Sequence, residues 1–381
     1  KLDGDIKTEV LIVGGGMAGV LTAFMLKEAG VDYLLVEQNE ICSGITGNTT
    51  AKITSQHGLI YNKLLGTYGE DYARMYWQAN EDAIEKYRSL CHDIPCGFEE
   101  KSNFVYSVGN NENILREMNA LKKLGIPASY TAETPLPFSV KGAVEFKNQA
   151  QFNPMKFVSA IAEGLNIREH TRVKEFGKGV VTTDSGRISA KNIIIATGRS
   201  GANFVSDFCK SNDVKMRSNH IDIGVRVEMK DIIWKEFSDK IYEPKILYKT
   251  KTFEDRCRMF CFNKGGLVSA ENNHGIITAN GHSYAEDEKR TENCNFAILS
   301  SIRFTEPFNQ PTEYAENISR LANMIGNGSV LVQRFGDLIR GRRTNDHRLK
   351  QNTVEPTLKA TAGDISLVLP HRILTNIIET I

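Results

Sequence analysis

The sequence predicts an α/β fold in its first half and a mainly antiparallel α+β region in its second half. Three observations predict this division. An apolar run at 10–13 leads into a glycine-rich turn and a helical segment, the order expected at the start of a parallel sheet. A second apolar run, within 192–198, ends in small residues, and from about residue 220 apolar and polar residues alternate with a period of two. At 381 residues the chain is long enough for two domains.

The first of these segments has the spacing GxGxxG. Gly14, Gly16 and Gly19 stand between the strand expected at 10–13 and a helix expected from about Met17 to Ala29. The first glycine permits a tight turn, the second lets a diphosphate approach the backbone, and the third lets the helix pack closely on the strand. The free N–H groups and the positive end of the helix dipole then face the phosphates. This unit is therefore predicted to bind a dinucleotide.

An acidic residue follows the next predicted strand. Residues 33–36 form an apolar run, and Glu37 stands at its end. A carboxylate there accepts hydrogen bonds from a ribose diol and repels a 2′-phosphate, so the expected ligand is FAD or NAD rather than NADP. The strand before, the helix after and this acid make the GxGxxG spacing specific. The predicted contacts from this unit are Gly14, Gly16, Met17, Ala18, Gly19, Glu37 and Gln38.

A loop rich in small and hydroxyl residues, 41–52, comes directly after this acid. Its backbone and hydroxyl donors suit phosphates and sugars, and a solvated turn is the alternative. The position after the ribose acid favours the ligand, so Thr46 is a candidate contact.

A mixed α/β segment is expected next. Apolar residues at helical spacing predict helices from Glu70 to Leu90 and from Glu112 to Leu124, while 104–108 and 142–146 have the composition of strands. The predicted inward positions of the first helix are Tyr72, Met75, Tyr76, Ala79 and Ala83. We interpret this segment as part of a cap domain and its apolar stripe as packing.

The chain then returns to the first sheet. Asn153 and Pro154 have the N-cap and first-turn identities that begin a helix. Strands are expected at 171–176, 180–183 and 187–190. The strand after them ends in three small residues, where bulky side chains would collide with a dinucleotide lying across the strand tips. These predicted contacts are Ala196, Thr197 and Gly198.

The second half has the period of antiparallel strands. Strands are expected at 220–228, 256–262, 275–279 and 295–304. A helix is expected at 311–325, ended by Gly326, with its inward face formed by Tyr314, Ile318, Leu321 and Met324.

Charge and cysteine content narrow the class of protein. Lys plus Arg number 47 and Asp plus Glu number 46, which argues against a nucleic-acid or anionic-membrane surface and favours a small-molecule partner. The charge-free stretch 10–26 is shorter than the roughly 20 apolar residues of a membrane span and contains glycines. Seven cysteines, without the spacing of a zinc or thioredoxin motif, indicate reduced thiols in a cytoplasmic protein without a metal site.

Together these features resemble the glutathione-reductase-like flavoprotein fold, in which a GxGxxG unit, a small β-meander and an Ala-Thr-Gly strand build one FAD site. Residues 8–197 resemble the FAD-dependent glycine/D-amino-acid oxidase family most closely, through 46–58 and the meander at 171–173. Residues 198–381 resemble a family of bacterial FAD-dependent dehydrogenases whose substrate is not known; the matching stretches are 222–228, 250–258, 280–284 and 333–337. Our hypothesis is that the chain joins an oxidase-like FAD half to a cap sheet of the second family.

The resemblance implies further contacts and a domain division. It places Val173 against the adenine through its backbone, and it places Thr49, Thr50 and Ala51 along the flavin or the diphosphate. No second GxGxxG unit follows a strand, so FAD is favoured over NAD. The expected FAD-binding domain, a parallel sheet plus β-meander, comprises 1–90, 150–205 and 355–381, and the expected antiparallel α+β cap domain comprises 91–149 and 206–354.

The expected function is hydride transfer from a small amine, amino acid or related carboxylate to the flavin, with an electron acceptor that the sequence does not name. Arg256 and Arg258 share one strand face and can hold a carboxylate, and His282 can move a proton. The alternatives are that the arginines pair with Asp255, Glu254 or other surface acids, and that the histidine only braces a loop. In both families a Gly-Asp turn late in the chain closes the FAD site. This sequence is expected to end before that turn. A flavin- or nucleotide-binding protein without turnover is therefore one alternative function, and an NAD-dependent dehydrogenase is another.

Overall fold

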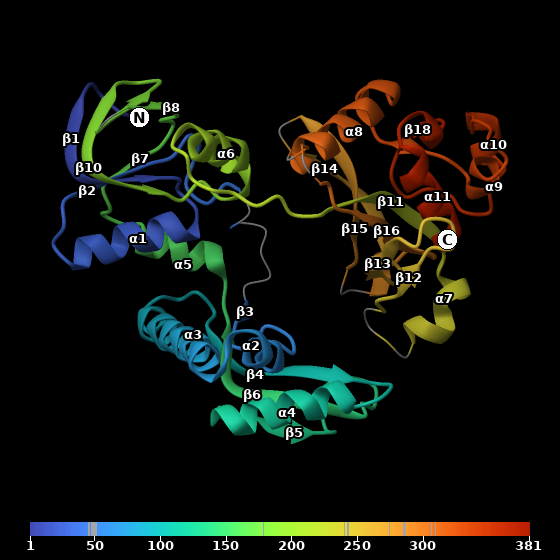
Figure 1. The fold of residues 1–381 in the computed structure, drawn as a ribbon, viewed down its shortest axis with the longest axis horizontal. Coiled ribbons are helices and arrows are strands. Elements are labelled where there is room, and N and C mark those ends of the chain that lie inside the picture. Colours follow the sequence, from blue (N-terminus) through green and yellow to red (C-terminus); the bar gives the residue numbers. More distant parts are fainter. Residues whose placement is uncertain are drawn as a thin grey trace. The chain divides into compact units, whose positions relative to one another are not determined.

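The computed structural model describes the chain except for residues 45, 47–51, 178, 240, 242–243, 274, 285–286, 306 and 309. Its contacts divide the chain into two compact units, residues 1–215 and residues 216–381 (Figure 1). Each unit has its own sheets and its own hydrophobic clusters, so each is described by itself.

A six-stranded sheet forms the centre of the first unit, in the order β7-β2-β1-β10-β9-β8. The first four strands are parallel neighbours, and β10, β9 and β8 form an antiparallel meander. Their bounds are β1 Ile6–Val13, β2 Tyr33–Val36, β7 Ile167–Arg168, β8 Val173–Phe176, β9 Val180–Thr183 and β10 Arg187–Ile195. The predicted parallel strands and meander are confirmed, with β1 beginning earlier than expected and with 187–195 forming one strand.

The two faces of this sheet are both buried, which explains the unbroken apolar runs. Ile12 and Leu35 belong to one hydrophobic cluster, while Leu11 and Leu34 belong to another, and none of the four side chains reaches solvent. Alternate residues of a strand point to opposite faces, so a strand that is covered on both sides must be apolar throughout.

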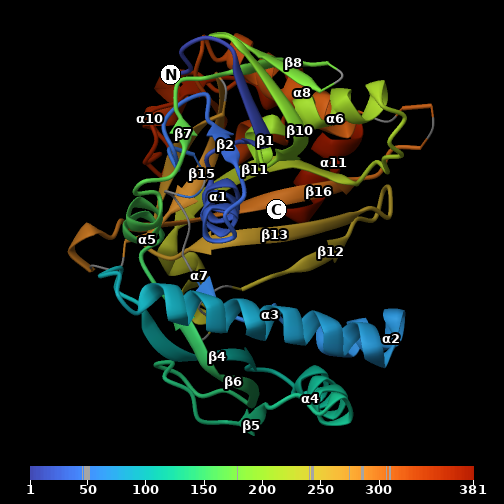
Figure 2. The same cartoon turned by 90° about the vertical axis from the view of Figure 1, so that its left-hand side faces the viewer.

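Two helices, α1 (Met17–Glu28) and α5 (Pro154–Ile161), lie side by side on one face of this sheet (Figures 1 and 2). α5 begins as predicted, because the Asn153 side chain accepts a hydrogen bond from the Lys156 N–H at 3.0 Å and Pro154 occupies the first turn. The buried residues of the two helices are Gly19, Val20, Ala23, Pro154, Phe157, Val158 and Ile161. After β10, α6 (Ala202–Ser211) packs two phenylalanine rings on Phe176 of β8.

The remainder of the first unit is a smaller α/β segment. A sheet of order β3-β6-β4, with β5 also paired to β6, carries helices α2, α3 and α4. The bounds are β3 Lys52–Ile53, α2 Tyr61–Tyr68, α3 Glu70–Cys91, β4 Glu99–Ser107, α4 Glu112–Leu124, β5 Ser129–Thr131 and β6 Gly142–Gln151. Its core includes Tyr61 stacked on Phe146, with 5.9 Å between ring centroids. The predicted helices and strands are confirmed, with both main strands longer than expected.

An antiparallel sheet of order β11-β16-β13-β12 forms the centre of the second unit, as the period-two pattern predicted. A hairpin, β14-β15, and a short parallel pair, β17-β18, accompany it. The bounds are β11 Ile221–Lys230, α7 Asp231–Ser238, β12 Leu247–Lys249, β13 Arg256–Asn263, β14 Leu267–Asn273, β15 Ile276–His282, β16 Asn293–Ile302, α8 Pro311–Ile325, β17 Leu331–Val332, α9 Phe335–Leu338, α10 Asp346–Lys350, β18 Thr361–Ala362 and α11 His371–Thr380.

The C-terminal segment packs inside the second unit. Ile373 and Ile377 of α11 are buried in the core cluster of the β11-β16-β13-β12 sheet. At the start of that helix Arg372 forms two hydrogen bonds to Asp255, at 2.6 and 2.7 Å. This placement differs from the expectation that 355–381 return to the domain of the first sheet. The reason is the apolar stripe of α11, which the second sheet covers.

Two predicted helix faces need correction. On α3 the buried residues are Ala73, Ile84 and Cys91, whereas Tyr72 and Met75, which were expected to face inward, are exposed. On α8, Tyr314 and Ile318 pack against the core as expected, but Met324 is 71% exposed. Helical spacing alone does not decide which neighbour covers a stripe, because long apolar side chains are also common on protein surfaces.

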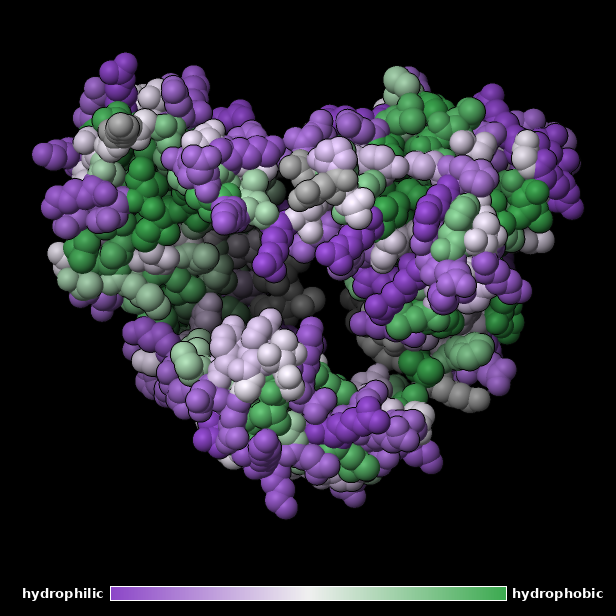
Figure 3. Space-filling model, viewed as in Figure 1, coloured by the Kyte–Doolittle hydropathy of each residue, from purple (hydrophilic) through white to green (hydrophobic). Residues whose placement is uncertain are grey.

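The visible surface of the second unit mixes hydrophilic and hydrophobic side chains (Figure 3). Exposed hydrophobic residues of this unit include Ile232, Ile233, Phe237, Leu247 and Met324. No helix in the described part of the chain is both long and apolar enough to cross a membrane.

Candidate dinucleotide site

The turn between β1 and α1 shows why two of its glycines are required. Gly14 has a left-handed backbone, with φ +112°, and a Cβ on it would overlap the carbonyl group of Ala196. A Cβ on Gly19 would overlap the carbonyl oxygen of Gly14. The first and third positions of the motif therefore serve the turn and the close packing of helix on strand, as predicted.

The middle glycine has open space beside it. The nearest atom to a Cβ on Gly16 would be Thr46 Oγ1, at 3.7 Å. Gly16 and Met17 are half-buried and Ala18 is exposed, so the first turn of α1 is accessible from outside. Thr46 also accepts a hydrogen bond from the Met17 N–H at 3.2 Å, which places this predicted loop residue at the helix N-terminus. A diphosphate fits here, because the accessible N–H groups and the helix dipole favour an anion.

Glu37 lies beside the same turn. Its carboxylate accepts hydrogen bonds from the Gly15 N–H at 2.7 Å and from the Asn39 N–H at 2.9 Å. Each carboxylate oxygen has two lone pairs, so both oxygens keep capacity for a ribose hydroxyl. The side chain is half-buried and Gln38 next to it is exposed. Glu37 thus has a bracing role that the sequence did not reveal, and its predicted position beside the turn is compatible with a ribose.

Gly15, which lies outside the GxGxxG positions, is a further requirement of this arrangement. A Cβ on it would lie 2.9 Å from Glu37 Cβ and 3.0 Å from a methyl group of Ile41. The close approach brings the Gly15 N–H onto the carboxylate. The three consecutive glycines are visible in the sequence, but only the fold shows that Gly15 contacts Glu37.

The strand tip at 196–198 lies against the turn between β1 and α1. The Ala196 N–H donates to the Val13 carbonyl at 2.8 Å, and a Cβ on Gly14 would reach Thr197 Cα at 3.0 Å. Gly198 follows with φ +62°, a left-handed backbone that suits glycine. The first β-strand and the Ala-Thr-Gly strand therefore end at the same place.

The remaining predicted contacts are placed in part. Thr171, two residues before Val173, donates its N–H to the Glu37 carbonyl at 2.8 Å, so the start of β8 lies near the end of β2. Val173 itself packs in a hydrophobic cluster with Val13 and Val36. Thr49, Thr50 and Ala51 lie outside the described residues.

The three catalytic candidates lie in the second unit. Arg258 forms an ion pair with Asp222 at 2.5 Å and its guanidinium lies 5.0 Å from the ring centre of Phe260. Arg258 is thus paired with an acid, as in the alternative to a substrate-binding role, although the acid is neither Asp255 nor Glu254. Arg256 is exposed on the same strand, and His282 is exposed with its ring against Tyr284. A catalytic role for these residues stays a prediction.

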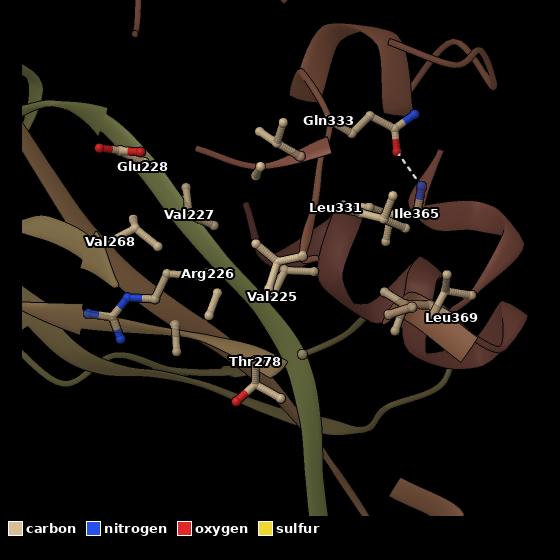
Figure 4. A pocket seen from close by; sticks show the side chains of 18 of the residues that line it. Val225, Arg226, Val227, Glu228, Val268, Thr278, Leu331, Gln333, Ile365 and Leu369 are labelled. Atoms are coloured by element: carbon tan, nitrogen blue, oxygen red, sulfur yellow. Dashed lines mark hydrogen bonds between the residues drawn. The ribbon is translucent and has the colours of Figure 1, made fainter. Parts of the chain in front are cut away.

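A cavity in the second unit was not predicted from the sequence. It has a volume of about 660 Å³ and is lined by residues of β11, β14, β15, β16, α8 and the segment after α8 (Figure 4). Most lining side chains are apolar, and Arg226 is one of the few charged ones. Its wall is formed by residues that are far apart in sequence, so no local sequence motif predicts this cavity.

The chain belongs to the family described as FAD dependent oxidoreductase, whose model matches residues 9–285. Residues 220–381 also match the family described as FAD-dependent protein, C-terminal domain-like. The cofactor is therefore FAD, and the accessible helix N-terminus and Glu37 fit its diphosphate and ribose.

Two curated relatives cover about half of this chain. The Bacillus subtilis (strain 168) protein YhfW, whose name describes a Rieske 2Fe-2S iron-sulfur protein, is 35% identical over 206 residues, which are 51% of this chain and 40% of YhfW. Gamma-glutamylputrescine oxidoreductase of Escherichia coli (strain K12) is 24% identical over 223 residues, which are 51% of this chain and 50% of that protein. The chain thus spans half or less of the length of these relatives. Among solved structures, L-proline dehydrogenase from P. horikoshii aligns with a TM-score of 0.47 and 16% identity, over 82% of this chain and 76% of that one.

Proposed function

We propose that this protein oxidises a small amine, amino acid or related carboxylate by hydride transfer to FAD. The observation that carries the proposal is the accessible first turn of α1 with Glu37 beside it, in a chain of the FAD dependent oxidoreductase family. The names of two relatives, gamma-glutamylputrescine oxidoreductase and 4-methylaminobutanoate oxidase, support the substrate class. We further propose that the β7-β2-β1-β10-β9-β8 sheet is the FAD-binding sheet of a glutathione-reductase-like fold.

The residues of the first unit have distinct roles in this proposal. Bound FAD supplies the hydride acceptor. Glu37 accepts hydrogen bonds from the adenosine ribose and so orients the cofactor. The first turn of α1 from Ala18 onward faces the diphosphate, where the helix dipole offsets its charge, and the Met17 N–H donates to Thr46 beside it. The short side chains at 196–198 leave room beside the strand tip, while Val173, Thr49, Thr50 and Ala51 complete the predicted contacts.

An absorbance spectrum of the purified protein tests the cofactor, and anaerobic titration tests the reaction. We expect flavin absorbance that is bleached by at least one member of a panel of small amines and amino acids. Protein that carries flavin but is not bleached by any of them would favour the alternative of flavin binding without turnover. Protein that neither contains nor takes up FAD would contradict the proposal.

Replacement of Glu37 by arginine tests the site itself. Glu37→Arg puts a cation beside Gly15 and removes the acceptor for the ribose, so we expect the flavin content to fall by roughly tenfold or more. Glu40→Arg is the matched control, because Glu40 is exposed three residues further on. Equal flavin content in the two variants would refute the assignment.

A further inference from the structure

Within the described chain, the second unit has a long sheet edge that no other strand covers. β11 is an outer strand of the β11-β16-β13-β12 sheet and has 10 residues, whereas β12, the other outer strand, has 3. β11 pairs with β16 over its whole length without a register shift, and it contains no proline. Long regular edges are usually covered or interrupted in proteins, because their free backbone groups can pair with another strand.

Every second residue of β11 directs its backbone away from the sheet. In an antiparallel pair, alternate residues bond to the neighbouring strand, and the residues between them direct their N–H and carbonyl groups to the other side. Among the residues that the structure describes, the outward backbone groups of 222–229 have no hydrogen-bond partner. Such groups beside an apolar cavity are unfavourable unless water or a ligand satisfies them.

Two charged side chains of β11 lean inward over the sheet and leave its outer edge uncovered. Asp222 pairs with Arg258 of β13. Arg226 donates to Asn295 Oδ1 of β16 at 2.9 and 2.6 Å. These charges therefore do not protect the edge in the way that outward-pointing charges protect many edge strands.

The cavity described above runs along the same edge. Eight consecutive residues, 222–229, line it, and its volume of about 660 Å³ is in the range of ligand sites. Leu331, Gln333 and Ile365 lie across the cavity from β11 (Figure 4). All lining residues belong to the second unit. A ligand that contacts the whole lined length of β11 must therefore be extended along the strand.

The two faces of β11 give the cavity two different sides. Val225 and Val227 point to the face that packs on the hydrophobic core, and Leu369 lines the cavity from that core. Arg226 points to the opposite face, and the polar side chain of Thr278 also lines the cavity. Because side chains alternate along a strand, a new strand paired with β11 would place every second side chain on the apolar side.

We propose that the outer edge of β11 binds an extended peptide segment of a partner protein, in which apolar and polar residues alternate. The peptide adds a strand to the four-stranded sheet, and its backbone pairs with the outward N–H and carbonyl groups of 222–229. Its apolar side chains enter the cavity beside Val225 and Val227. A small apolar ligand would fill the cavity but leave these backbone groups unpaired. The site uses neither FAD nor the proposed oxidation.

The test is fluorescence anisotropy of a labelled short peptide of alternating valine and threonine, with lysine at both ends, titrated with the full chain. Two further peptides carry N-methyl groups, one on its valine amides and the other on its threonine amides. In a strand the N–H groups of these two sets point to opposite edges, so one modification alone removes the hydrogen bonds to β11.

We expect one methylated peptide to bind roughly tenfold or more weakly than the unmodified peptide, and the other to bind like it. Absence of binding by the unmodified peptide, or equal binding of the two methylated peptides, overturns the proposal. Equal binding at the unmodified level would show that the cavity accepts apolar groups without strand pairing. This comparison uses the unmodified chain, so it holds even if a variant fails to fold.

Ser319→Trp tests whether the cavity is the site. Ser319 lies on α8 and lines the cavity, so an indole ring there takes up part of its volume. We expect this variant to bind the unmodified peptide roughly tenfold more weakly, with its folding checked by circular dichroism. Asn317→Trp is the matched control, because Asn317 is exposed on the same helix outside the lining. Equal affinity of the two folded variants would place the peptide elsewhere and refute the inference.

Discussion

The packing of α1 on β1 depends on the absence of a side chain at Gly19. A Cβ at this position would lie 1.9 Å from the carbonyl oxygen of Gly14, whereas such atoms need about 3.0 Å. The start of α1 would therefore have to move by roughly 1 Å away from a close-packed interface, at a cost of about 1–3 kcal/mol or more. The higher helix propensity of alanine relative to glycine stabilises the folded state by only about 1 kcal/mol, which offsets part of this cost. Because the overlap is with backbone atoms, the cost lies at the upper end of this range, about 3 kcal/mol, and we expect Gly19→Ala to lower the free energy of unfolding by roughly 2 kcal/mol.

Gly66→Ala is the matched control for this prediction. Gly66 lies in α2, is exposed, and a Cβ there would meet no atom within 4 Å. The same exchange should thus raise stability by about 0.5–1 kcal/mol. Urea denaturation followed by far-ultraviolet circular dichroism measures both changes, and flavin absorbance reports whether Gly19→Ala also loses cofactor through displacement of the helix N-terminus. Gly19→Ala that is as stable as the unmodified protein, with full flavin content, would refute the reasoning.

Two further predictions concern pH and thiol reactivity. The hydrogen bond from Arg372 holds the pKa of Asp255 below its ordinary value, so its stabilising contribution is present above about pH 4 and is lost as pH falls through the folded-state value. Asp255→Asn should therefore flatten the acid side of a plot of Tm against pH. The control Glu254→Gln, at an exposed neighbouring residue, should leave that side of the plot unchanged. If Tm falls with decreasing pH in Asp255→Asn as steeply as in the unmodified protein, the prediction is contradicted. Burial raises the pKa of the Cys294 thiol to about 12, so iodoacetamide should alkylate the half-buried Cys209 well before Cys294 in the native state. Mass spectrometry measures both rates, and comparable rates would show that the core around Cys294 opens readily.

The sequence predicted the β1-α1-β2 unit well because its signals are local. Four apolar residues that are buried on both faces must form an unbroken run, and the turn after them requires glycine where φ is positive or where two backbones touch. Gly14 and Gly19 show both requirements directly. The strand that ends just before Ala196 was recognisable for the same reason, since small residues are needed where another backbone lies close.

The exposed and buried faces of helices were less predictable. Spacing correctly indicated that 70–91 and 311–325 are helices. It did not reveal that Met75 and Met324 face solvent, because burial depends on which distant segment covers a face. The same limit applied to α11, which packs on a sheet formed by strands from earlier in the chain, β11, β13 and β16.

The amino-acid sequence by itself determined the dinucleotide motif, the acidic residue after β2 and the antiparallel character of the second half, since each follows from spacing and periodicity along neighbouring residues. Only the tertiary structure decided that Glu37 binds the Gly15 N–H, that 355–381 belong to the second unit, and that β11, β15 and α8 line a common cavity. These features join residues 20 to 150 positions apart, and a charge, a carbonyl or a cavity wall acquires its partner only when the chain has folded.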